Sequence, residues 1–358
     1  MRLLLAGGGT GGHLFPAVAL AEQLKREEPE SRVLFVGTKQ GLEARLLPEL
    51  GWPLKTIDMS GWAGLGLRGR FRALGNLCRG FSQARRILKE FCPQVIIGVG
   101  GYASVPVLLA AKTLKMPFLI HEQNAWPGLA NRMLGRWSRT ICLSYPAAAQ
   151  AFPGRRTVVT GNPVRAAMGQ CPALDEGPLV LLVFGGSHGA RAINRAMLAA
   201  LPCLRQCEDL KIIHQAGRLD FDEVVAGYRQ AGWDKVDVQP FINDMAAAYR
   251  QASLVVCRAG ATTLAELTAC GRPAILVPYP HAAGGHQAAN ARALVERGAA
   301  LMIEQSELTP EALGRQIVDL LKDRQRLHAM AAAAKQMARP AAAADLLAEC
   351  RRLSAANG

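Results

Sequence analysis

A short apolar strand that runs into a cluster of glycines, and then into an apolar-periodic helix, occurs twice in the chain. The first copy is LLLAGGGTGGH at residues 3–13, and the second is LVLLVFGGSHGARAIN at residues 179–194. Continuous Val/Ile/Leu strands that alternate with helices are typical of parallel sheets covered on both faces. The repetition therefore predicts an α/β fold with two Rossmann-like, doubly wound parallel-sheet domains, facing each other across a cleft.

Further strands are expected after each copy of this unit. They are residues 33–37, 95–102, 117–124 and 140–144 in the first half, and 211–217, 236–241, 254–263 and 274–280 in the second. Turn residues and Pro163 place the joint near residues 161–173, and the Ala-rich segment 329–350 is typical of a helix that Pro340 interrupts. The chain of 358 residues is long enough for two domains. The expected divisions are 1–163, 164–338 and a C-terminal helix in 339–358.

Charge divides the chain unequally. Residues 1–163 hold 21 Lys/Arg against 9 Asp/Glu, a net charge of +12, whereas residues 164–358 hold 21 against 19, a net charge of +2. A strongly basic half predicts an anionic partner, either nucleic acid or an anionic membrane. The absence of a recognisable nucleic-acid-binding module in the sequence disfavours nucleic acid.

Two further features of the sequence concern its cellular compartment. No run of 18 uncharged apolar residues is present, and the N-terminal apolar stretch breaks into glycines after a few residues. This pattern disfavours a transmembrane helix and a signal peptide, so we expect a cytoplasmic protein. The nine cysteines lack the spacings of zinc and thioredoxin sites, as expected of ordinary thiols in a reducing compartment.

The first glycine loop fits the G-x-G-x-x-G pattern at Gly7, Gly9 and Gly12. A glycine loop at a helix N-terminus favours an anionic ligand. NAD would need an acid at the end of the second strand, but that strand ends Gly37-Thr38-Lys39, so an NADP-dependent oxidoreductase using Thr38 and Lys39 stays an alternative. His13 directly follows the glycines and is either a structural residue or a general base.

The second half offers three loops at helix starts. Gly185–Gly189 could hold a diphosphate, with Ser187 donating a hydrogen bond, and Arg165 either adds a charge-assisted contact or pairs with a surface acid. Glu266 is expected in the first turn of the helix after CRAG, as a dipole partner or as an acceptor for ribose hydroxyls. The amides of Gln287 and Asn290 suit a hydroxyl-rich sugar.

One pair of acids resembles a metal motif. Asp220-Phe221-Asp222 matches the D-x-D of some glycosyltransferases, but Asp220 with Glu223 also fits a helix cap with an acid at its third position. We favour the cap, and the sequence shows no other metal cluster. We therefore expect neither a metal nor a cofactor.

Eight segments together resemble the MurG family of bacterial glycosyltransferases, within glycosyltransferase family 28. They are GGGTGGHLFP (7–16), GVGGYAS (98–104), HEQN (121–124), TGNPVR (160–165), GGSHGAR (185–191), FINDMAAAY (241–249), CRAGATTLAE (257–266) and HQAANA (286–291). The resemblance implies the GT-B fold, with the acceptor on the N-terminal domain, the nucleotide sugar on the C-terminal one, and the last helix returning to the first domain.

The resemblance also implies an activity. The family transfers N-acetylglucosamine (GlcNAc) from UDP-GlcNAc to lipid I, the undecaprenyl-diphosphate-linked muramyl-pentapeptide. The product is lipid II, and this is the last cytoplasmic step of peptidoglycan precursor synthesis. Because the donor linkage is α and the product is β, a single inverting displacement is implied, which needs a base and stabilisation of the departing UDP. Helix N-termini and Arg165 can supply the latter without a metal.

Carried over motif by motif, the resemblance assigns roles to named residues. Those at the donor sugar and acceptor are Thr10, Gly11, Gly12, Asn124 and Gln287, with His13 as the base and Tyr102, His121 and Glu122 as further acceptor contacts. Those at UDP are Arg165 and Ser187 on the diphosphate, Ile242 on uracil through its backbone, and Ala261, Thr262, Thr263, Leu264, Ala265 and Glu266 around the nucleotide, with Glu266 on the ribose. His188, Gly284 and Gly285 depart from the family pattern.

A membrane lipid as acceptor requires a membrane-facing surface. Residues 55–92 carry eight Lys/Arg against two acids, with interleaved apolar residues that include Trp62, Leu65 and Phe71. This stretch is either an ordinary helix with solvated arginines or a basic apolar surface for peripheral binding, and the charge excess favours the membrane. We expect a peripheral protein on the cytoplasmic face of the inner membrane that also contacts other cell-wall synthesis proteins. Another GT-B transferase with a different acceptor stays an alternative.

Overall fold

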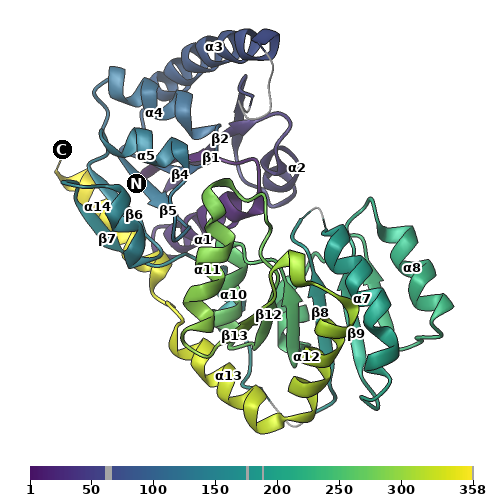
Figure 1. The fold of residues 1–358 in the computed structure, drawn as a ribbon. Helices are drawn as coiled ribbons and strands as arrows, with labels where there is room; N and C mark the ends of the chain where they lie inside the picture. The colour runs from purple at the N-terminus through teal and green to yellow at the C-terminus, as the bar shows by residue number, and fades with distance from the viewer. Residues whose placement is uncertain (61–66, 175–176, 188, 357–358) are drawn as a thin grey trace. The chain divides into compact units, whose positions relative to one another are not determined.

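The structure is a computed structural model that describes residues 1–60, 67–174, 177–187 and 189–356 (Figure 1). The chain divides into two compact units. The first unit comprises Met1–Arg165 together with Arg339–Gly358, and the second comprises Ala166–Ala338. Each unit is built on one parallel sheet.

The sheet of the first unit has seven strands in the order β3-β2-β1-β4-β5-β6-β7, and the paired strands are parallel. Their bounds are β1 (Arg2–Gly7), β2 (Arg32–Thr38), β3 (Leu54–Ile57), β4 (Val95–Gly100), β5 (Phe118–Glu122), β6 (Thr140–Leu143) and β7 (Thr157–Val159). The central strands are buried along nearly their whole length, which explains their continuous apolar sequences.

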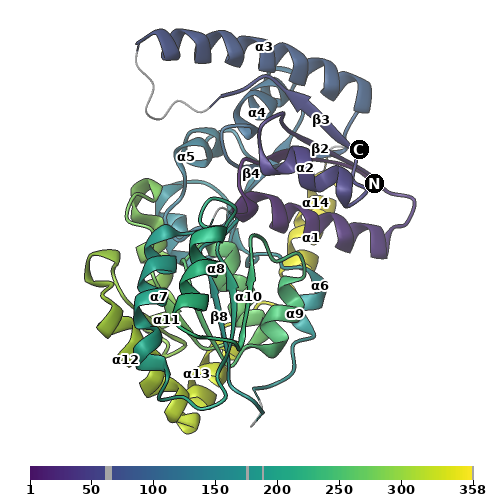
Figure 2. The same cartoon turned by 90° about the vertical axis from the view of Figure 1, so that its right-hand side faces the viewer.

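Helices cover both faces of this sheet. They are α1 (Gly11–Glu27), α2 (Leu42–Glu49), α3 (Leu67–Phe91), α4 (Ser104–Thr113), α5 (Leu129–Gly135), the 3-10 helix η1 (Pro146–Ala151) and α14 (Ala342–Ala355). Alternate residues of β1 point to opposite faces. Leu5 packs with α1, α2 and α14, whereas Leu4 packs with α3, α4 and α5. Figure 2 shows α3 beside β3 and α4.

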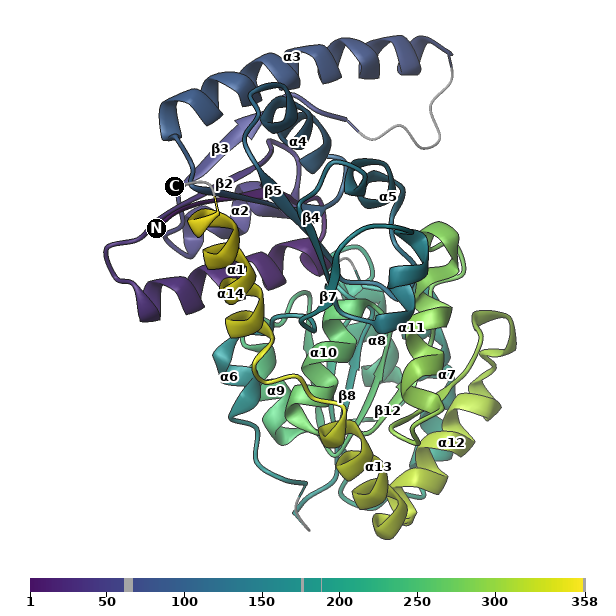
Figure 3. The same ribbon diagram turned by 90° about the vertical axis from the view of Figure 1, so that its left-hand side faces the viewer.

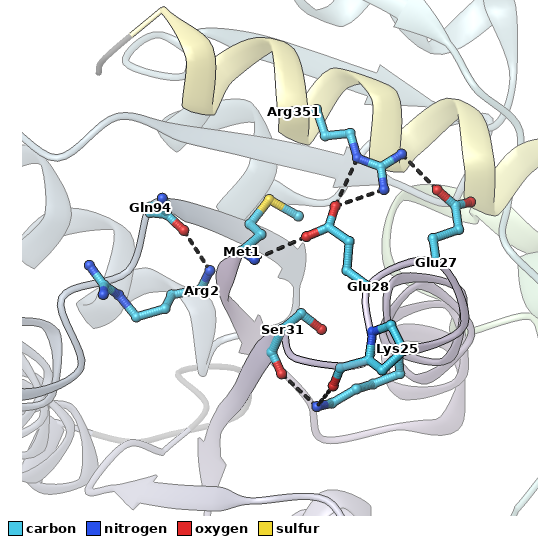
Figure 4. Close-up of polar contacts among 9 residues, drawn as sticks. Met1, Arg2, Lys25, Glu27, Glu28, Ser31, Gln94 and Arg351 are labelled. Atoms are coloured by element: carbon cyan, nitrogen blue, oxygen red, sulfur yellow. Dashed lines mark hydrogen bonds and ion pairs between the residues drawn. The ribbon is translucent and has the colours of Figure 1, made fainter.

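The last helix belongs to the first unit although it follows the second in sequence. After α13 ends at Gln336, the chain passes Pro340 and forms α14, which lies beside α1 (Figure 3). Leu346 and Leu353 enter the core of the first unit. Figure 4 shows the Arg351 guanidinium paired with Glu27 at 2.7 Å and with Glu28 at 2.8 Å, at the end of α1.

The sheet of the second unit has six strands in the order β10-β9-β8-β11-β12-β13, again with parallel pairs. Their bounds are β8 (Val180–Phe184), β9 (Lys211–Gln215), β10 (Val236–Gln239), β11 (Leu254–Cys257), β12 (Ala274–Leu276) and β13 (Ala300–Met302). The helices are α6 (Ala166–Gly169), α7 (Arg191–Leu204), α8 (Phe221–Gln230), α9 (Met245–Gln251), α10 (Ala261–Cys270), α11 (His286–Val295), α12 (Pro310–Lys322) and α13 (Arg324–Gln336), with the short η2 (Ala283–Gly285) and η3 (Gln305–Glu307).

Both sheets reverse their strand order at an equivalent point. The chain moves outward from β1 to β3 and then returns to β4 on the other side of β1, and β8 and β11 repeat this arrangement. The prediction of two Rossmann-like parallel sheets is therefore confirmed. In such sheets, ligands bind outside the carboxyl ends of the strands at the point of reversal. A ligand is accordingly expected at the loops after β1 and β4 in the first unit, and at those after β8 and β11 in the second.

Within the described ranges, no helix has both the length and the apolar character needed to cross a membrane.

Candidate active site

The first glycine loop connects β1 to α1 in a conformation that requires glycine. Gly9 has a φ of 90°, and the loop ends at Thr10, the N-cap of α1, whose backbone is extended. The Thr10 side chain is exposed and makes no capping hydrogen bond, while its carbonyl oxygen accepts from the amide nitrogens of His13 and Leu14. The Thr10 side chain therefore does not cap the N-terminus of α1, which is the end of a helix that favours an anion.

A buried carboxylate holds this loop in place. Glu43, at the start of α2, is fully buried, and its Oε2 accepts a hydrogen bond from the Gly9 amide at 2.7 Å. Its Oε1 accepts from the amide and the hydroxyl of Thr38 at 2.8 and 3.0 Å. A Cβ atom on Gly8 or Gly37 would overlap the Glu43 side chain. Sequence analysis missed Glu43, although the glycines at 37 and 41 mark the space that its side chain fills.

The contacts of Thr38 and Lys39 argue against the alternative that these two residues bind NADP. Thr38 is 2% exposed and commits both its amide and its hydroxyl to Glu43. Lys39 pairs with Asp58 at 3.5 Å. The two residues expected to bind NADP therefore serve the loop and a surface ion pair instead.

The His13 ring packs against the backbone at the end of β4. A Cβ on Gly100 would lie 3.0 Å from the imidazole ring, and one on Gly101 would lie 2.6 Å from the carbonyl oxygen of Gly8. Both glycines have positive φ, at 95° and 77°. The GVGGY segment thus leaves room for the His13 ring between the loops after β1 and β4. The ring is half-buried, so it can still meet a ligand.

A chain of hydrogen bonds from two carbonyl groups fixes the tautomer of His13. The Gly161 carbonyl oxygen lies 3.0 Å from His121 Nε2 and can only accept, so His121 carries its proton there. The Gln123 amide nitrogen then donates to His121 Nδ1 at 3.1 Å and to the Val99 carbonyl oxygen at 2.9 Å. The Gln123 oxygen faces His13 Nδ1 at 3.1 Å, which must therefore donate. Neutral His13 consequently has its lone pair on Nε2.

Burial keeps His121, which is part of this series of hydrogen bonds, neutral. It lowers the pKa of His121 to about 4, because the charged imidazolium loses its water, and the nearby His13 adds to this effect. His121 and Glu122 are 0% and 1% exposed, and their contact with the acceptor stays a prediction.

Glu122 orders the loop that carries Asn124. Its Oε1 accepts from the backbone and side-chain amides of Asn124 at 2.9 and 3.1 Å. Its Oε2 accepts from Asn131 Nδ2 at 2.8 Å and from the Gly128 amide at 3.2 Å. Asn124 is therefore held at the carboxyl end of β5.

Tyr102 and Arg165 also belong to the first unit. A Cβ on Gly9 would lie 3.6 Å from the Tyr102 ring, so this ring adjoins the glycine loop. The Arg165 guanidinium stacks 4.9 Å from the centre of the Phe15 ring on α1. Burial raises the pKa of Glu22, and the charge of Arg165 partly opposes this rise. Arg165 is thus grouped with α1 and not with the second unit, where sequence analysis placed it.

The second glycine loop connects β8 to α7. Gly186 and Gly189 have φ of 90° and 76°, and the Gly189 amide closes a turn on the Gly186 carbonyl oxygen at 3.0 Å. Ser187 lies in this turn and is half-buried. His188 lies outside the described residues. Ile242 follows β10, is 5% exposed, and donates its amide to Gln215 Oε1 at 2.9 Å.

The third loop leads into α10, which begins at Ala261 after the N-cap Gly260. Glu266 was expected in the first turn of this helix, but it is the sixth residue and lies in the second turn. A carboxylate there gains little from the helix dipole, which acts within the first turn. Glu266 is 7% exposed and accepts a hydrogen bond from the buried Tyr249 hydroxyl at 3.3 Å.

The two amides on α11 differ in accessibility. Gln287 is half-buried, and its Oε1 accepts from the Tyr279 amide at 2.9 Å. Asn290 is fully buried and donates to the Ala259 carbonyl oxygen at 3.3 Å. Asn290 therefore joins α11 to the loop after β11, and its contact with a sugar stays a prediction.

Asp220 neither caps α8 with its side chain nor joins a metal cluster. It occupies the N-cap position without a capping hydrogen bond, because α7 offers it stronger donors. Arg191 donates to its Oδ1 at 2.9 Å and Asn194 to its Oδ2 at 3.0 Å. In the part of the chain that the structure describes, no group of three or more His, Cys, Asp or Glu is placed to hold a metal ion.

Comparison with known proteins agrees with this arrangement. The chain is 56% identical over 354 residues to a UDP-N-acetylglucosamine--N-acetylmuramyl-(pentapeptide) pyrophosphoryl-undecaprenol N-acetylglucosamine transferase of Syntrophotalea carbinolica, covering 99% of each chain. It is 48% identical to the protein of the same name from Geobacter sulfurreducens, covering 98% of each. The crystal structure of Acinetobacter baumannii MurG superposes with a TM-score of 0.78 at 36% identity, covering 98% of this chain and 99% of that one.

The family models divide the chain as its two sheets do. Residues 3–143, which include β1 to β6, match the glycosyltransferase family 28 N-terminal domain. Residues 180–346, which include β8 to β13, match the glycosyltransferase family 28 C-terminal domain. With a glycine loop at the strand reversal in each matched half, the chain belongs to glycosyltransferase family 28.

Proposed function

We propose that this protein transfers GlcNAc from UDP-GlcNAc to lipid I and so makes lipid II. The observation that carries this proposal is the full-length match to transferases of that name, together with a glycine loop at the strand reversal of both sheets. The donor binds the second unit through Ser187, Ile242 and the segment Ala261–Glu266. The acceptor binds the first unit at the loop from Gly7 to Gly12.

The chemistry is a single displacement that inverts the anomeric carbon. His13 Nε2 accepts the proton of the acceptor hydroxyl, whose oxygen forms the new bond to the anomeric carbon as the bond to UDP breaks. Gln123 keeps the other ring nitrogen protonated, so Nε2 is the one available as base. Tyr102 adjoins the glycine loop and Asn124 lies at the carboxyl end of β5, where both orient the sugars, and Gln287 contacts the GlcNAc.

The departing diphosphate needs positive charge, which the chain supplies. Backbone amides at the starts of α7 and α10 and the side chain of Arg165 are the groups proposed for this role. Thr262 and Thr263 lie in the first turn of α10, where hydroxyls and amides can reach a phosphate.

Release of UDP from UDP-GlcNAc in the presence of a short-chain lipid I analogue tests this activity. Because helix N-termini and Arg165 neutralise the diphosphate, an excess of EDTA should leave most of the turnover intact. Complete loss that magnesium or manganese restores would revive the metal role of Asp220 and Asp222. Thermal shifts with UDP-GlcNAc and with NADPH, measured separately, distinguish a transferase from an oxidoreductase.

A basic apolar surface on the first unit suits peripheral attachment to an anionic membrane. Four large apolar side chains in α5 or within three residues of its ends are exposed: Trp126 by 45%, Leu129 by 65%, Met133 by 52% and Trp137 by 38%. Cations stand over the two tryptophan rings, with Arg132 at 5.8 Å from Trp126, and Lys112 and Arg136 at 3.6 and 5.5 Å from Trp137. Tryptophan beside Lys and Arg is typical of the membrane–water interface.

This surface adjoins the basic stretch 55–92, since α5 packs on α4 and α4 packs on α3 (Figure 2). In the described part of α3, Leu74 is 49% exposed and Arg79, Arg86 and Lys89 are exposed. Phe81 packs against the core instead, so this half of α3 has an ordinary buried face. Trp62 and Leu65, and the side chains of Arg68, Arg70, Phe71 and Arg72, lie outside the described residues.

Reversing two charges on α5 should weaken binding to vesicles that contain anionic phosphatidylglycerol. We expect the Arg132→Glu/Arg136→Glu variant to co-sediment several-fold less than the parent, since each cation contributes about 1 kcal/mol near an anionic surface. The control is Arg297→Glu/Arg315→Glu, the same change of charge at exposed arginines of the second unit. Equal loss in both variants would show that only net charge matters, and no loss in either would remove α5 from the membrane face.

A further inference from the structure

One buried side chain in the second unit joins two segments that are far apart in sequence. Gln215 is the last residue of β9 and is 3% exposed. Its amide nitrogen donates to the Gly186 carbonyl oxygen at 2.7 Å, and its amide oxygen accepts from the Ile242 amide at 2.9 Å. Both partners are backbone groups of fixed polarity, so the orientation of the Gln215 amide is determined.

The two partners belong to different proposed subsites of the donor. Gly186 lies in the glycine loop proposed to hold the diphosphate, and Ile242 provides the backbone proposed to hold uracil. The loop also rests on the end of β9, because a Cβ on Gly189 would overlap the Ala216 carbonyl group. The carboxyl end of β9 is therefore the common support of both subsites.

We propose that Gln215 is a positioning residue for the nucleotide, which sets the distance between the uracil subsite and the diphosphate subsite. This inference rests on the proposed function, because it assumes that a uridine diphosphate occupies both. A ligand that spans the two subsites gains from their fixed spacing, since binding at one end presents the other end at a high effective concentration. A ligand that fills one subsite gains nothing from the spacing.

The matched control lies on the neighbouring strand. Gln239 ends β10 and pairs in register with Gln215, but its side chain is partly exposed and donates only to Asp237 at 2.7 Å among the hydrogen bonds described. Gln215→Met and Gln239→Met therefore make the same chemical change at adjacent strand ends. Gln215→Glu is a third variant, which keeps an acceptor for the Ile242 amide and loses the donor to Gly186.

Binding of UDP, uridine and inorganic diphosphate to the full chain, measured by calorimetry or by competition, tests the inference. We expect Gln215→Met to weaken UDP at least tenfold and to weaken uridine and diphosphate much less, while Gln239→Met matches the parent. Gln215→Glu should retain uridine binding and lose affinity for UDP. The KM for UDP-GlcNAc should rise in Gln215→Met with a smaller change in kcat.

Each of three results would contradict either the proposed function or the positioning role of Gln215. A parent protein that does not bind UDP contradicts the proposed function. A parent that binds UDP, with Gln215→Met binding it equally well, contradicts the role of Gln215 alone. An equal loss of all three ligands in Gln215→Met would mean that the domain is generally disrupted, and it would also overturn the positioning role.

Discussion

Replacing His13 with alanine should lower kcat by about 10²–10⁴, the range usual for loss of a general base. The expected cause is chemical, because His13 Nε2 is the nitrogen that the Gln123 hydrogen bond leaves unprotonated. UDP affinity should stay within about twofold of the parent, since the residues proposed to bind UDP at the uracil and ribose lie in the second unit. Single-turnover rates and calorimetry with UDP measure the two effects separately.

His13→Gln is the control for this experiment. It keeps a polar side chain at the start of α1 but has no group that can take a proton near neutral pH. Both variants should therefore lose kcat to a similar extent, because neither retains the Nε2 lone pair. Normal turnover by a folded His13→Gln protein would place the base elsewhere. His121 and Glu122 are poor substitutes, because both are buried and hydrogen-bonded within the protein.

Replacing Glu43 with alanine should destabilise the first unit by about 3 kcal/mol or more. The change leaves the amides of Gly9 and Thr38 and the Thr38 hydroxyl without their hydrogen-bond acceptor. Each buried polar group left unsatisfied costs about 1–3 kcal/mol. Four of the five tryptophans precede residue 166, so tryptophan fluorescence during denaturation reports mainly on this unit. The acceptor kcat/KM should fall as well, because the Gly9 amide is released.

Glu49→Ala is the matched control for Glu43, because it removes an exposed glutamate from the same helix. Its stability should equal that of the parent to within about 0.5 kcal/mol. If Glu43→Ala unfolded at the same denaturant concentration as Glu49→Ala, the carboxylate would not hold the glycine loop.

The strands that sequence analysis finds and misses differ in their place in the sheet. Central strands such as β1, β4 and β8 are covered on both faces, so their apolar runs are continuous and visible. The missed strands β3, β7 and β13 are three or four residues long and lie at sheet edges, where fewer side chains need to be apolar. Each of these edge strands forms by pairing with its one neighbouring strand, and its own sequence does not predict it.

The site residues show the same division. Glycines and His13 are predictable, because the strand–loop–helix pattern is local. Glu43 and Gln215 are not, because Gly9 lies 34 residues from Glu43 and Ile242 lies 27 residues from Gln215, and only the fold brings each pair together. The polarity of Gln215 does not distinguish it within β9, because this five-residue strand also contains Lys211 and His214. The burial of Asn290 and the place of Glu266 in the second turn of α10 depend on packing that the sequence does not display.

The return of α14 to the first unit sets the order in which the protein can fold during synthesis. Chains emerge from the ribosome N-terminus first, at about 5–20 residues per second. The second unit is continuous, so its core is complete before α14 exists. Until then the face of α1 that carries Leu20 and Leu24 lacks Leu346 and Leu353, which complete its core. The half of the protein that is translated first is thus finished last, and its uncovered apolar face is the surface that a nascent-chain chaperone would protect.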